Sequence, residues 1–179
     1  MSQFKELKNF LKPDYLELKE QIFHPNTVWS RNDGNYLQRG QDQDRGWFSH
    51  VIISRPSDEF PYSWPASSLA KLASNALREI LNDNGIKMET FHRIAVNLLV
   101  RQPDNWAPGQ HHDHEFDYKH LIIYLNDSDG DTIMFNNKKQ IIDRSTPKED
   151  KVISFGKEWH TAYLPMLYPD RKVIVATYS

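Results

Sequence analysis

The second half of the chain consists of short apolar segments separated by turn residues, and this pattern constrains the fold more than any other feature. Residues 92–101 are rich in Ile, Val and Leu, and residues 121–125 form a compact apolar run. Asn, Asp, Ser and Gly at 126–130 turn the chain before the next segment. Further strand-like segments lie at 132–135, 151–155, 159–164 and 172–178. Short strands at this spacing, with helical patterns confined to the first half, predict an antiparallel sandwich or barrel with flanking helices.

The first helical segment begins at Pro13, because proline is tolerated in a first helical turn, and it ends before Pro25. The side chains expected on its buried face are Leu16, Ile22 and Phe23. A polar stretch, 31–46, follows and is rich in Asn, Asp, Gln and Gly. We expect residues 32–45 to form a loop near the mouth of a binding pocket that becomes ordered when a substrate binds.

The second helical segment, 68–84, has Leu, Ala and Ile at helical spacing. Ser67 or Ser68 can cap its start, and Gly85 follows its end. Between the two helical segments, residues 48–54 contain the run Val51-Ile52-Ile53, which is typical of a strand. We therefore expect an α+β, mainly β fold in which the helices pack across the outside of a sheet.

The charge and the cysteine content exclude several classes of protein. The formal net charge of −2 gives no strong nucleic-acid signal, because binding to a phosphate backbone needs a basic surface. The absence of cysteine excludes disulfides, thiolate zinc sites and a cysteine nucleophile, and it fits a reducing compartment. No apolar run approaches the roughly 20 residues that span a bilayer, and the start lacks the apolar segment of a signal peptide. These features predict a cytoplasmic protein without a membrane partner, in the host cytoplasm if it is viral.

The segment Gln110-His111-His112-Asp113-His114-Glu115 is rich in metal-binding side chains. If the segment is extended, alternate side chains point to the same side, so that His111 and Asp113 face one way and His112 and His114 face the other. A His-x-Asp pair with one distant histidine makes a set of two imidazoles and one carboxylate. Such a facial set binds non-haem iron(II) and leaves the opposite positions of the metal open for a co-substrate and O2.

The third ligand of such a set has to come from elsewhere in the chain. Beyond the immediate neighbour His114, the downstream candidates are His120 and His160. His160 follows a turn at Gly156 and begins a strand-like segment, and Arg171 comes before the final strand. A guanidinium is the natural partner for a carboxylate that is held inside a pocket. From the spacing alone, a metal site and a group of solvated histidines both stay open.

The blocks from His111 onward resemble the core of the 2-oxoglutarate/iron(II)-dependent dioxygenases. The likeness is greatest to the prolyl-hydroxylase-like branch, including its phage-type members. The matching blocks are, in order, His111-His112-Asp113, 121–126, 129–132, 147–155, His160 and Arg171, preceded by 92–101 through Arg93 and Asn97. The resemblance implies a double-stranded β-helix core (jelly-roll, cupin-like) over 91–179. Residues 1–90 would add helical and strand support, so that 1–179 would form a single dioxygenase domain.

The resemblance also implies a role for each matching residue. His111, Asp113 and His160 would bind Fe(II), and Arg171 would pair with the distal carboxylate of 2-oxoglutarate. Tyr124 stands where a tyrosine hydroxyl commonly assists that carboxylate, and Asn97 would line the same pocket. The alternative for Tyr124 is a purely structural role as a core aromatic, and for Asn97 it is that of a hydrogen-bonded buried amide.

The implied activity is that of a hydroxylase that uses Fe(II), 2-oxoglutarate and O2, with ascorbate as an optional reductant. Its substrate would be an amino acid or a peptidyl, prolyl-like side chain, so the expected partner is a small molecule or a peptide. Succinate and CO2 would be released. The competing interpretations are a non-catalytic β-helix domain that binds a metal or a small molecule, an interaction module with incidental histidines, and a zinc hydrolase.

Two positions depart from the family pattern. Asp129-Gly130-Asp131 stands where many relatives carry a Gly-Gly pair, which moves the resemblance towards the phage-type members. Val173 stands two positions after Arg171, where many relatives carry a small hydroxylated residue. This second departure weakens the assignment of 2-oxoglutarate more than that of iron.

Overall fold

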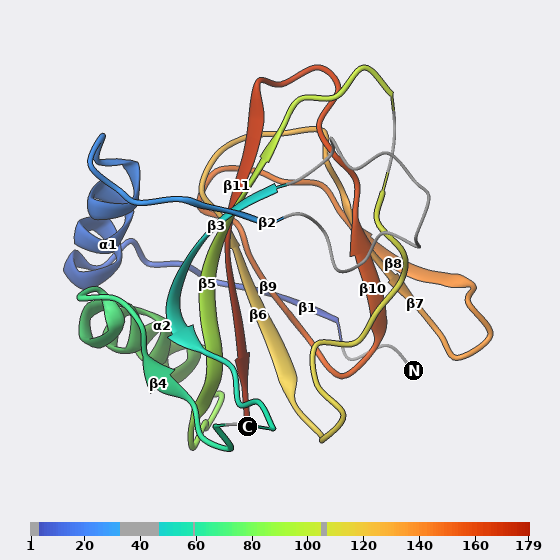
Figure 1. Ribbon diagram of the computed structural model, residues 1–179. Helices are drawn as coiled ribbons and strands as arrows, with labels where there is room; N and C mark the ends of the chain where they lie inside the picture. Colours follow the sequence, from blue (N-terminus) through green and yellow to red (C-terminus); the bar gives the residue numbers. More distant parts are fainter. Residues whose placement is uncertain (1–3, 33–46, 59, 105–106) are drawn as a thin grey trace.

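The computed structural model describes residues 4–32, 47–58, 60–104 and 107–179 (Figure 1). Within these ranges, the larger antiparallel sheet has the strand order β1 (Lys5–Leu7), β9 (Val152–Phe155), β6 (Lys119–Tyr124), β11 (Asp170–Tyr178), β5 (Phe91–Val100), β3 (Trp47–Ser54) and β2 (Ser30–Asn32). The short strand β4 (Trp64–Pro65) also pairs with β3. The smaller antiparallel sheet has the order β10 (Trp159–Ala162), β7 (Thr132–Phe135) and β8 (Ile141–Ser145).

Helices α1 (Pro13–Phe23) and α2 (Ala70–Asp83) lie together on one face of the larger sheet. The smaller sheet lies on the opposite side, so that the larger sheet forms the middle layer (Figure 1). This arrangement confirms the expected mainly β fold with helices across the outside of a sheet.

The central strands are buried on both faces, which is why they appear in the sequence as continuous apolar runs. In β6, Leu121 and Ile123 pack under the helices, whereas Ile122 and Tyr124 pack in a second cluster between the two sheets. Strand β11 alternates in the same way, and its odd-numbered positions face the space between the sheets. This alternation turns Arg171 into that space.

The predicted first helix forms, but its expected buried face is partly wrong. The buried side chains of α1 are Tyr15, Leu18 and Ile22. Leu16 and Phe23 are 48% and 44% exposed, respectively. Positions 15, 18 and 22 follow the helical repeat, and positions 16 and 23 each lie about 100° further around the helix.

The second helix also forms, although its start differs from the prediction. Its N-cap residue is Leu69, which makes no side-chain cap hydrogen bond. Ser67 supports the preceding turn instead, because its Oγ accepts a hydrogen bond from Leu69 N at 3.2 Å. Gly85 follows the helix with a φ of 67°, a conformation that glycine adopts without a steric penalty.

Two further predictions concern the chain outside these layers. Of the loop predicted at the pocket mouth, 32–45, Asn32 ends β2 and the rest lies outside the described residues. No helix in the described ranges is long and apolar enough to cross a membrane.

Candidate active site

A pocket lies between the two sheets, where β5 and β11 face β7 and β10. Its described lining consists of Trp47, Arg93, Asn97, Leu99, Pro108, His111, Asp113, Ile122, Thr132, His160, Thr161, Ala162, Arg171 and Val175. Asp113 is the one acidic side chain among these described lining residues. The structure thus brings the three predicted metal ligands into one cavity with Arg171 and Asn97.

His111 and His160 lie side by side in the pocket wall. His111 N donates to His160 O at 3.1 Å and His160 N donates to His111 O at 3.2 Å, and the ring centroids are 4.5 Å apart. Each Nδ1 lies near a backbone carbonyl oxygen two residues earlier, Gly109 O at 3.2 Å and Glu158 O at 3.3 Å. A carbonyl oxygen only accepts, so both Nδ1 atoms donate and both lone pairs remain on Nε2. This is how a metal-binding histidine is commonly oriented.

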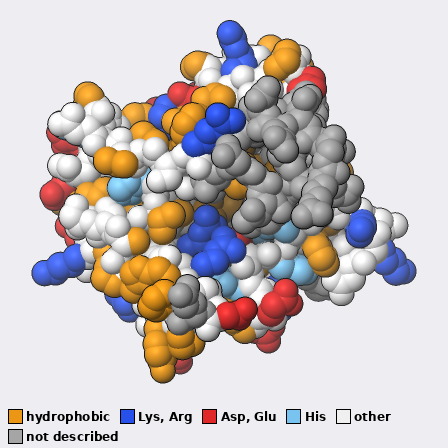
Figure 2. Space-filling model, in the orientation of Figure 1, with side chains coloured by type: hydrophobic (Ala, Val, Ile, Leu, Met, Phe, Trp, Pro, Cys, Tyr) orange, Lys and Arg blue, Asp and Glu red, His pale blue; other side chains and the backbone are white. Residues whose placement is uncertain are grey.

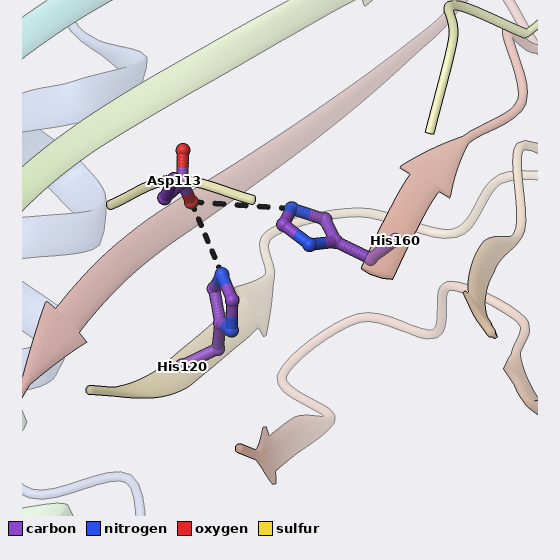
Figure 3. A group of neighbouring side chains, drawn as sticks. All are labelled: Asp113, His120 and His160. Atoms are coloured by element: carbon purple, nitrogen blue, oxygen red, sulfur yellow. Dashed lines mark hydrogen bonds and ion pairs between the residues drawn. The ribbon is translucent and has the colours of Figure 1, made fainter. Parts of the chain in front are cut away.

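Asp113 lies beside this pair and is surrounded by hydrogen-bond donors from several elements. Its Oδ2 is 3.1 Å from His120 Nε2 and 3.9 Å from His160 Nε2 (Figure 3). Its Oδ1 accepts hydrogen bonds from Arg55 at 3.3 Å and from Arg93 at 3.5 Å. One ligand atom from each of Asp113, His120 and His160 lies within 4.8 Å of the others, a spacing that one metal ion can bridge.

The protonation states at the site suit a divalent metal. Burial lowers the pKa of His160 well below its usual value, and burial also lowers the pKa of His111. Burial alone would raise the pKa of Asp113, but the hydrogen bond from His120 and the charge of Arg93 outweigh it and hold this pKa well below its usual value. Neutral imidazoles and an ionised carboxylate are the forms that bind metals.

His112 and His114, which flank Asp113 in the sequence, make their contacts outside the pocket lining. The His112 ring packs against the Trp159 ring with the centroids 4.0 Å apart and the ring planes tilted by 42°. His114 Nε2 lies 2.8 Å from Thr177 Oγ1, and burial lowers the pKa of His114 to about 4. As alternation predicts, His111 and Asp113 line the pocket and His112 and His114 do not. Residues 112–115 nevertheless form no strand, and His111 makes only an isolated β-bridge with His160.

Arg171 lies at the other end of the pocket, on β11, and is 3% exposed. Its Nη2 donates to Thr132 Oγ1 at 2.8 Å, and the Tyr124 hydroxyl donates to the same oxygen at 2.9 Å. Arg171 Nε is buried and has no hydrogen-bond partner among the described residues. A buried guanidinium with an unused donor is suited to binding an anion.

The turn before β7 supports this end of the pocket. A Cβ atom on Gly130 would lie 2.5 Å from Tyr163 O and 2.9 Å from Arg171 Cδ, so the chain passes too close for any side chain. The Asp129 carboxylate accepts hydrogen bonds from the backbone N–H groups of 166–168. The residues that stand in place of a Gly-Gly pair therefore shape the loop that leads to Arg171.

Of the other two predicted pocket residues, Asn97 lines the cavity and Tyr124 does not. Asn97 lines the cavity, and its Oδ1 is buried without a hydrogen-bond partner among the described residues. Tyr124 is fully buried and contributes through its contacts with Thr132 and with Arg171, whose guanidinium carbon is 5.5 Å from the tyrosine ring centroid.

Several side chains at the site were not assigned a role from the sequence. Thr132 and Trp47 line the pocket, and Arg55 reaches Asp113 across 58 residues of chain. Arg93 was noted only as a matching position, and His120 only as a possible distant ligand. The His-x-Asp motif alone does not reveal Arg55. This residue directly follows β3, and the pairing of β3 with β5 is needed to place it near Asp113.

No family model matches the sequence, and no curated protein matches it either. Solved structures do match. A 2OG-Fe(II) oxygenase-family oxidoreductase from Burkholderia pseudomallei has a TM-score of 0.71 at 12% identity, covering 98% of this chain and 85% of that one. A prolyl hydroxylase from Trichoplax adhaerens, in complex with a hypoxia inducible factor oxygen degradation domain peptide fragment, has a TM-score of 0.62 at 16% identity, covering 98% and 82%. The fold is that of the 2-oxoglutarate/iron(II) oxygenases.

A prolyl-4-hydroxylase from Pseudomonas putida shares this oxygenase fold, with a TM-score of 0.58 at 16% identity over 99% of this chain and 92% of that one. The predicted double-stranded β-helix and the predicted likeness to prolyl hydroxylases are therefore confirmed for the fold. The likeness to phage-type members stays a prediction. In the oxygenase fold of this chain, the smaller sheet and strands β5, β6 and β11 enclose the pocket described above.

Proposed function

We propose that the protein is an Fe(II)- and 2-oxoglutarate-dependent dioxygenase that hydroxylates an amino-acid or peptidyl side chain. One observation carries the proposal: in an oxygenase fold, His111, Asp113 and His160 line the same pocket as the buried Arg171. A domain that only held a metal would have no use for a desolvated guanidinium at the far end of the cavity. Burying such a charge is costly unless it is paired, and this favours an anionic co-substrate.

The metal would be held by Nε2 of His111, Nε2 of His160 and a carboxylate oxygen of Asp113. When bound, Fe(II) supplies, with 2-oxoglutarate and O2, the oxidising chemistry that hydroxylates a substrate and releases succinate and CO2. The chain contributes the geometry of this centre. Backbone carbonyl groups orient the two imidazoles, while Arg55 and His120 orient the carboxylate. Such supporting contacts keep the ligating atoms in place before the metal arrives.

A second ligand set would share Asp113 and His160 but use His120 in place of His111. We assign His111, because it lines the pocket through which the co-substrate has to reach the metal. His120 is fully buried and lies between Gly156 O at 3.0 Å and Asp113 Oδ2 at 3.1 Å. Its Nε2 lies against the carboxylate oxygen of Asp113, and its Nδ1 lies against a backbone carbonyl oxygen. His120 is therefore suited to orienting the carboxylate.

The distal carboxylate of 2-oxoglutarate would pair with Arg171. Thr132 and Tyr124 hold the guanidinium in position, and Arg171 Nε, which has no partner among the described residues, supplies an additional donor. Asn97, whose Oδ1 lacks a partner among the described residues, would face the same ligand. In a buried pocket each of these contacts is stronger than it would be in water.

The prolyl-like substrate class rests on the similarity to prolyl hydroxylases, one of which is in complex with a peptide. We propose a small molecule or a peptide as the substrate, with ascorbate as an optional reductant. We also propose that residues 1–179 act as one dioxygenase domain, in which 91–179 supply the metal ligands and 1–90 supply support.

The test is an assay of succinate release under air, with Fe(II), 2-oxoglutarate and ascorbate, in the presence of a panel of amino acids and peptides. We expect release that depends on both Fe(II) and 2-oxoglutarate and that is lost in Asp113→Ala. Binding of Fe(II) without any succinate release would favour the non-catalytic alternative. Failure to bind Fe(II) or Mn(II) at all would contradict the metal centre itself.

A further inference from the structure

A second groove lies on the helix side of the larger sheet, where α2 faces β4 and the start of β5. Its volume is about 370 Å³, which lies within the range of ligand-binding sites, about 300–1,000 Å³. None of its described lining residues also lines the pocket between the two sheets. The groove is therefore separate from the candidate metal centre.

Two basic side chains of α2 line this groove. Lys71 and Arg78 lie two helical turns apart with Ser74 between them, so they share one side of the helix and are separated by about 10.5 Å along its axis. Both are exposed, and within the described part of the chain neither forms a hydrogen bond or an ion pair. Glu89 is the one acidic residue among the described lining residues, and it forms no ion pair with either of them. The two cations are therefore available to an acidic partner.

Three exposed aromatic side chains adjoin the groove through Trp64, which lines it. Phe60, Tyr62 and Trp64 are 55%, 80% and 39% exposed, respectively. The rings of Phe60 and Trp64 pack together with the centroids 5.3 Å apart. Figure 2 shows hydrophobic side chains gathered in the lower left part of this face, where Figure 1 places β4. Aromatic rings are enriched in protein interfaces, and gathered exposed apolar side chains mark interaction sites.

The groove and the candidate active site lie at the same ends of β3 and β5. Ser54 pairs with Trp64 at the end of β3, and the next residue, Arg55, donates a hydrogen bond to the Asp113 carboxylate. At the start of β5, Phe91 lines the groove, and two residues later Arg93 lines the pocket on the other face of the sheet. A polypeptide with one residue at the metal can therefore continue around these strand ends and enter the groove.

The spacing of the two cations fits an extended acidic segment. In a polyproline II helix, residues three positions apart lie on the same side and are about 9 Å apart, at about 3.1 Å per residue. Two carboxylates at such positions match Lys71 and Arg78, and aromatic-lined grooves are where such helices usually dock. A single-stranded nucleic acid also stacks on aromatic rings. However, Glu89 in the groove and the net charge of −2 disfavour a phosphate backbone.

We propose that this groove binds an acidic, extended segment of a polypeptide substrate. Lys71 and Arg78 pair with two carboxylates of the segment, and the rings of Phe60, Tyr62 and Trp64 contact its apolar side chains. This inference rests on the proposed function, and it narrows the substrate to a polypeptide that carries acidic residues away from the residue that reacts. The groove then selects the polypeptide, while the pocket selects the reacting side chain.

The test is isothermal titration of two blocked peptides into the full chain without metal. One peptide is acetyl-Ala-Glu-Pro-Pro-Glu-Ala-amide, and the other has Gln in place of both Glu residues. We expect the Glu peptide to bind about 3- to 30-fold more tightly at low salt, the range that two exposed ion pairs provide. The difference should shrink as the salt concentration is raised, because exposed charges are screened. Equal affinities, or no binding of either peptide, would overturn the proposal.

Variants connect the preference to the groove. The double variant Lys71→Gln/Arg78→Gln should bind both peptides equally, whereas Tyr62→Ala should weaken both alike, because its ring contributes without a charge. Lys5→Gln/Lys138→Gln is the matched control, since it removes the same charge from exposed positions on β1 and after β7. This control should keep the whole preference for the Glu peptide. An unchanged preference in the double variant, or its loss in the control, would overturn the proposal.

Two further outcomes separate this proposal from its competitors. Tighter binding of a short single-stranded oligothymidylate than of the Glu peptide would overturn it, because the partner of the groove would then be a nucleic acid. Failure of the proposed function has a different signature, since these titrations need neither metal nor 2-oxoglutarate. Binding of the Glu peptide without any succinate release would support the groove and contradict the dioxygenase. Succinate release without binding of either peptide would overturn the groove alone.

Discussion

His111 and His160 are oriented in the same way, each through its Nδ1 by the carbonyl oxygen of the residue two positions earlier, and reciprocal backbone hydrogen bonds join the two residues. Their Nε2 atoms are therefore presented to the pocket by backbone geometry. Backbone contacts do not depend on a bound ion, so this half of the candidate metal centre is preorganised. The predictions below begin from this pair.

Replacing a proposed ligand should remove the metal. We expect His111→Ala and Asp113→Ala to weaken binding of Fe(II) or Mn(II) by more than about 100-fold, since the loss of a supporting residue alone costs about 10- to 100-fold. His112→Ala should bind one equivalent as the wild type does, because the His112 ring packs against Trp159 outside the pocket lining. Electron paramagnetic resonance of Mn(II) measures metal binding in all three variants. Loss of metal in His112→Ala with retention in His111→Ala would refute this ligand set.

His120 should support the metal without binding it. We expect His120→Ala to weaken Mn(II) binding by about 10- to 100-fold while keeping one equivalent at saturation, because Asp113 loses the donor to its Oδ2. Isothermal titration gives the affinity and the stoichiometry together. If His120→Ala abolishes binding and His111→Ala preserves it, the ligand set is Asp113, His120 and His160.

Arg171→Gln should weaken 2-oxoglutarate binding and leave the metal in place. Removing one partner of a buried charge pair costs about 2–5 kcal/mol, or roughly 30- to 5,000-fold in affinity at about 1.4 kcal/mol per tenfold. Iron binding should survive, because Arg171 is not a proposed ligand. Anaerobic titration of 2-oxoglutarate into the Fe(II) protein, followed by the metal-to-ligand absorption band, measures the change. A titration curve equal to that of the wild type would disprove the role of Arg171.

Gly130→Ala should disturb the Arg171 end of the pocket through a steric clash. The added Cβ would meet Tyr163 O at 2.5 Å and Arg171 Cδ at 2.9 Å, so the backbone or the arginine has to move. We expect a loss of about 1–3 kcal/mol in the free energy of unfolding, together with weaker 2-oxoglutarate binding. Gly109→Ala is the control, because a Cβ there meets no described atom within 4 Å. Urea denaturation compares the two variants, and equal stabilities would contradict the close approach.

Asp129 should make stability depend on pH in the acid range. Burial alone would raise its pKa, but hydrogen bonds from the backbone N–H groups of Leu167, Met166 and Tyr168 outweigh this and lower it below the usual 3.8. Because the folded-state pKa is depressed, the stabilisation is complete above the unfolded pKa and is lost as pH falls through the folded value. Asp129→Asn should cost about 1 kcal/mol at pH 7, since the group is partly exposed. The difference from the wild type should shrink below about pH 4, and a constant difference down to pH 2 would count against it.

The sequence predicted the central strands and both helices because their signals are local. Strands β5, β6, β7 and β11 are apolar runs bounded by turns, and burial on both faces reinforces the pattern. Strands β1, β2, β4 and β8 were not predicted. The first three have only two or three residues, and β8 carries Asp143 and Arg144 in its five residues, so none has enough apolar character to identify it.

The candidate site was predictable where its residues form a motif and not where the fold brings single residues together. His111 and Asp113 lie two positions apart in the sequence, and Arg171 directly precedes the apolar run of residues 172–178. Arg55 carries no such signal, because its position near Asp113 depends on the pairing of β3 with β5 and on the bend of the chain after His111. Which histidine supports Asp113 and which binds metal likewise depends on hydrogen-bond acceptors, such as Gly156 O, that no motif specifies.

The contacts of Asp113 also bear on the order of events in folding. Its side chain meets His120 across 7 residues of sequence, Arg93 across 20 and Arg55 across 58. Closing the longest of these loops, from Asp113 to Arg55, is entropically the most costly, so this contact is expected to be completed late. The complete metal site would then form only after the folding transition state. A metal ion would leave the refolding rate nearly unchanged and would slow unfolding, so that it protects the finished protein without guiding its assembly.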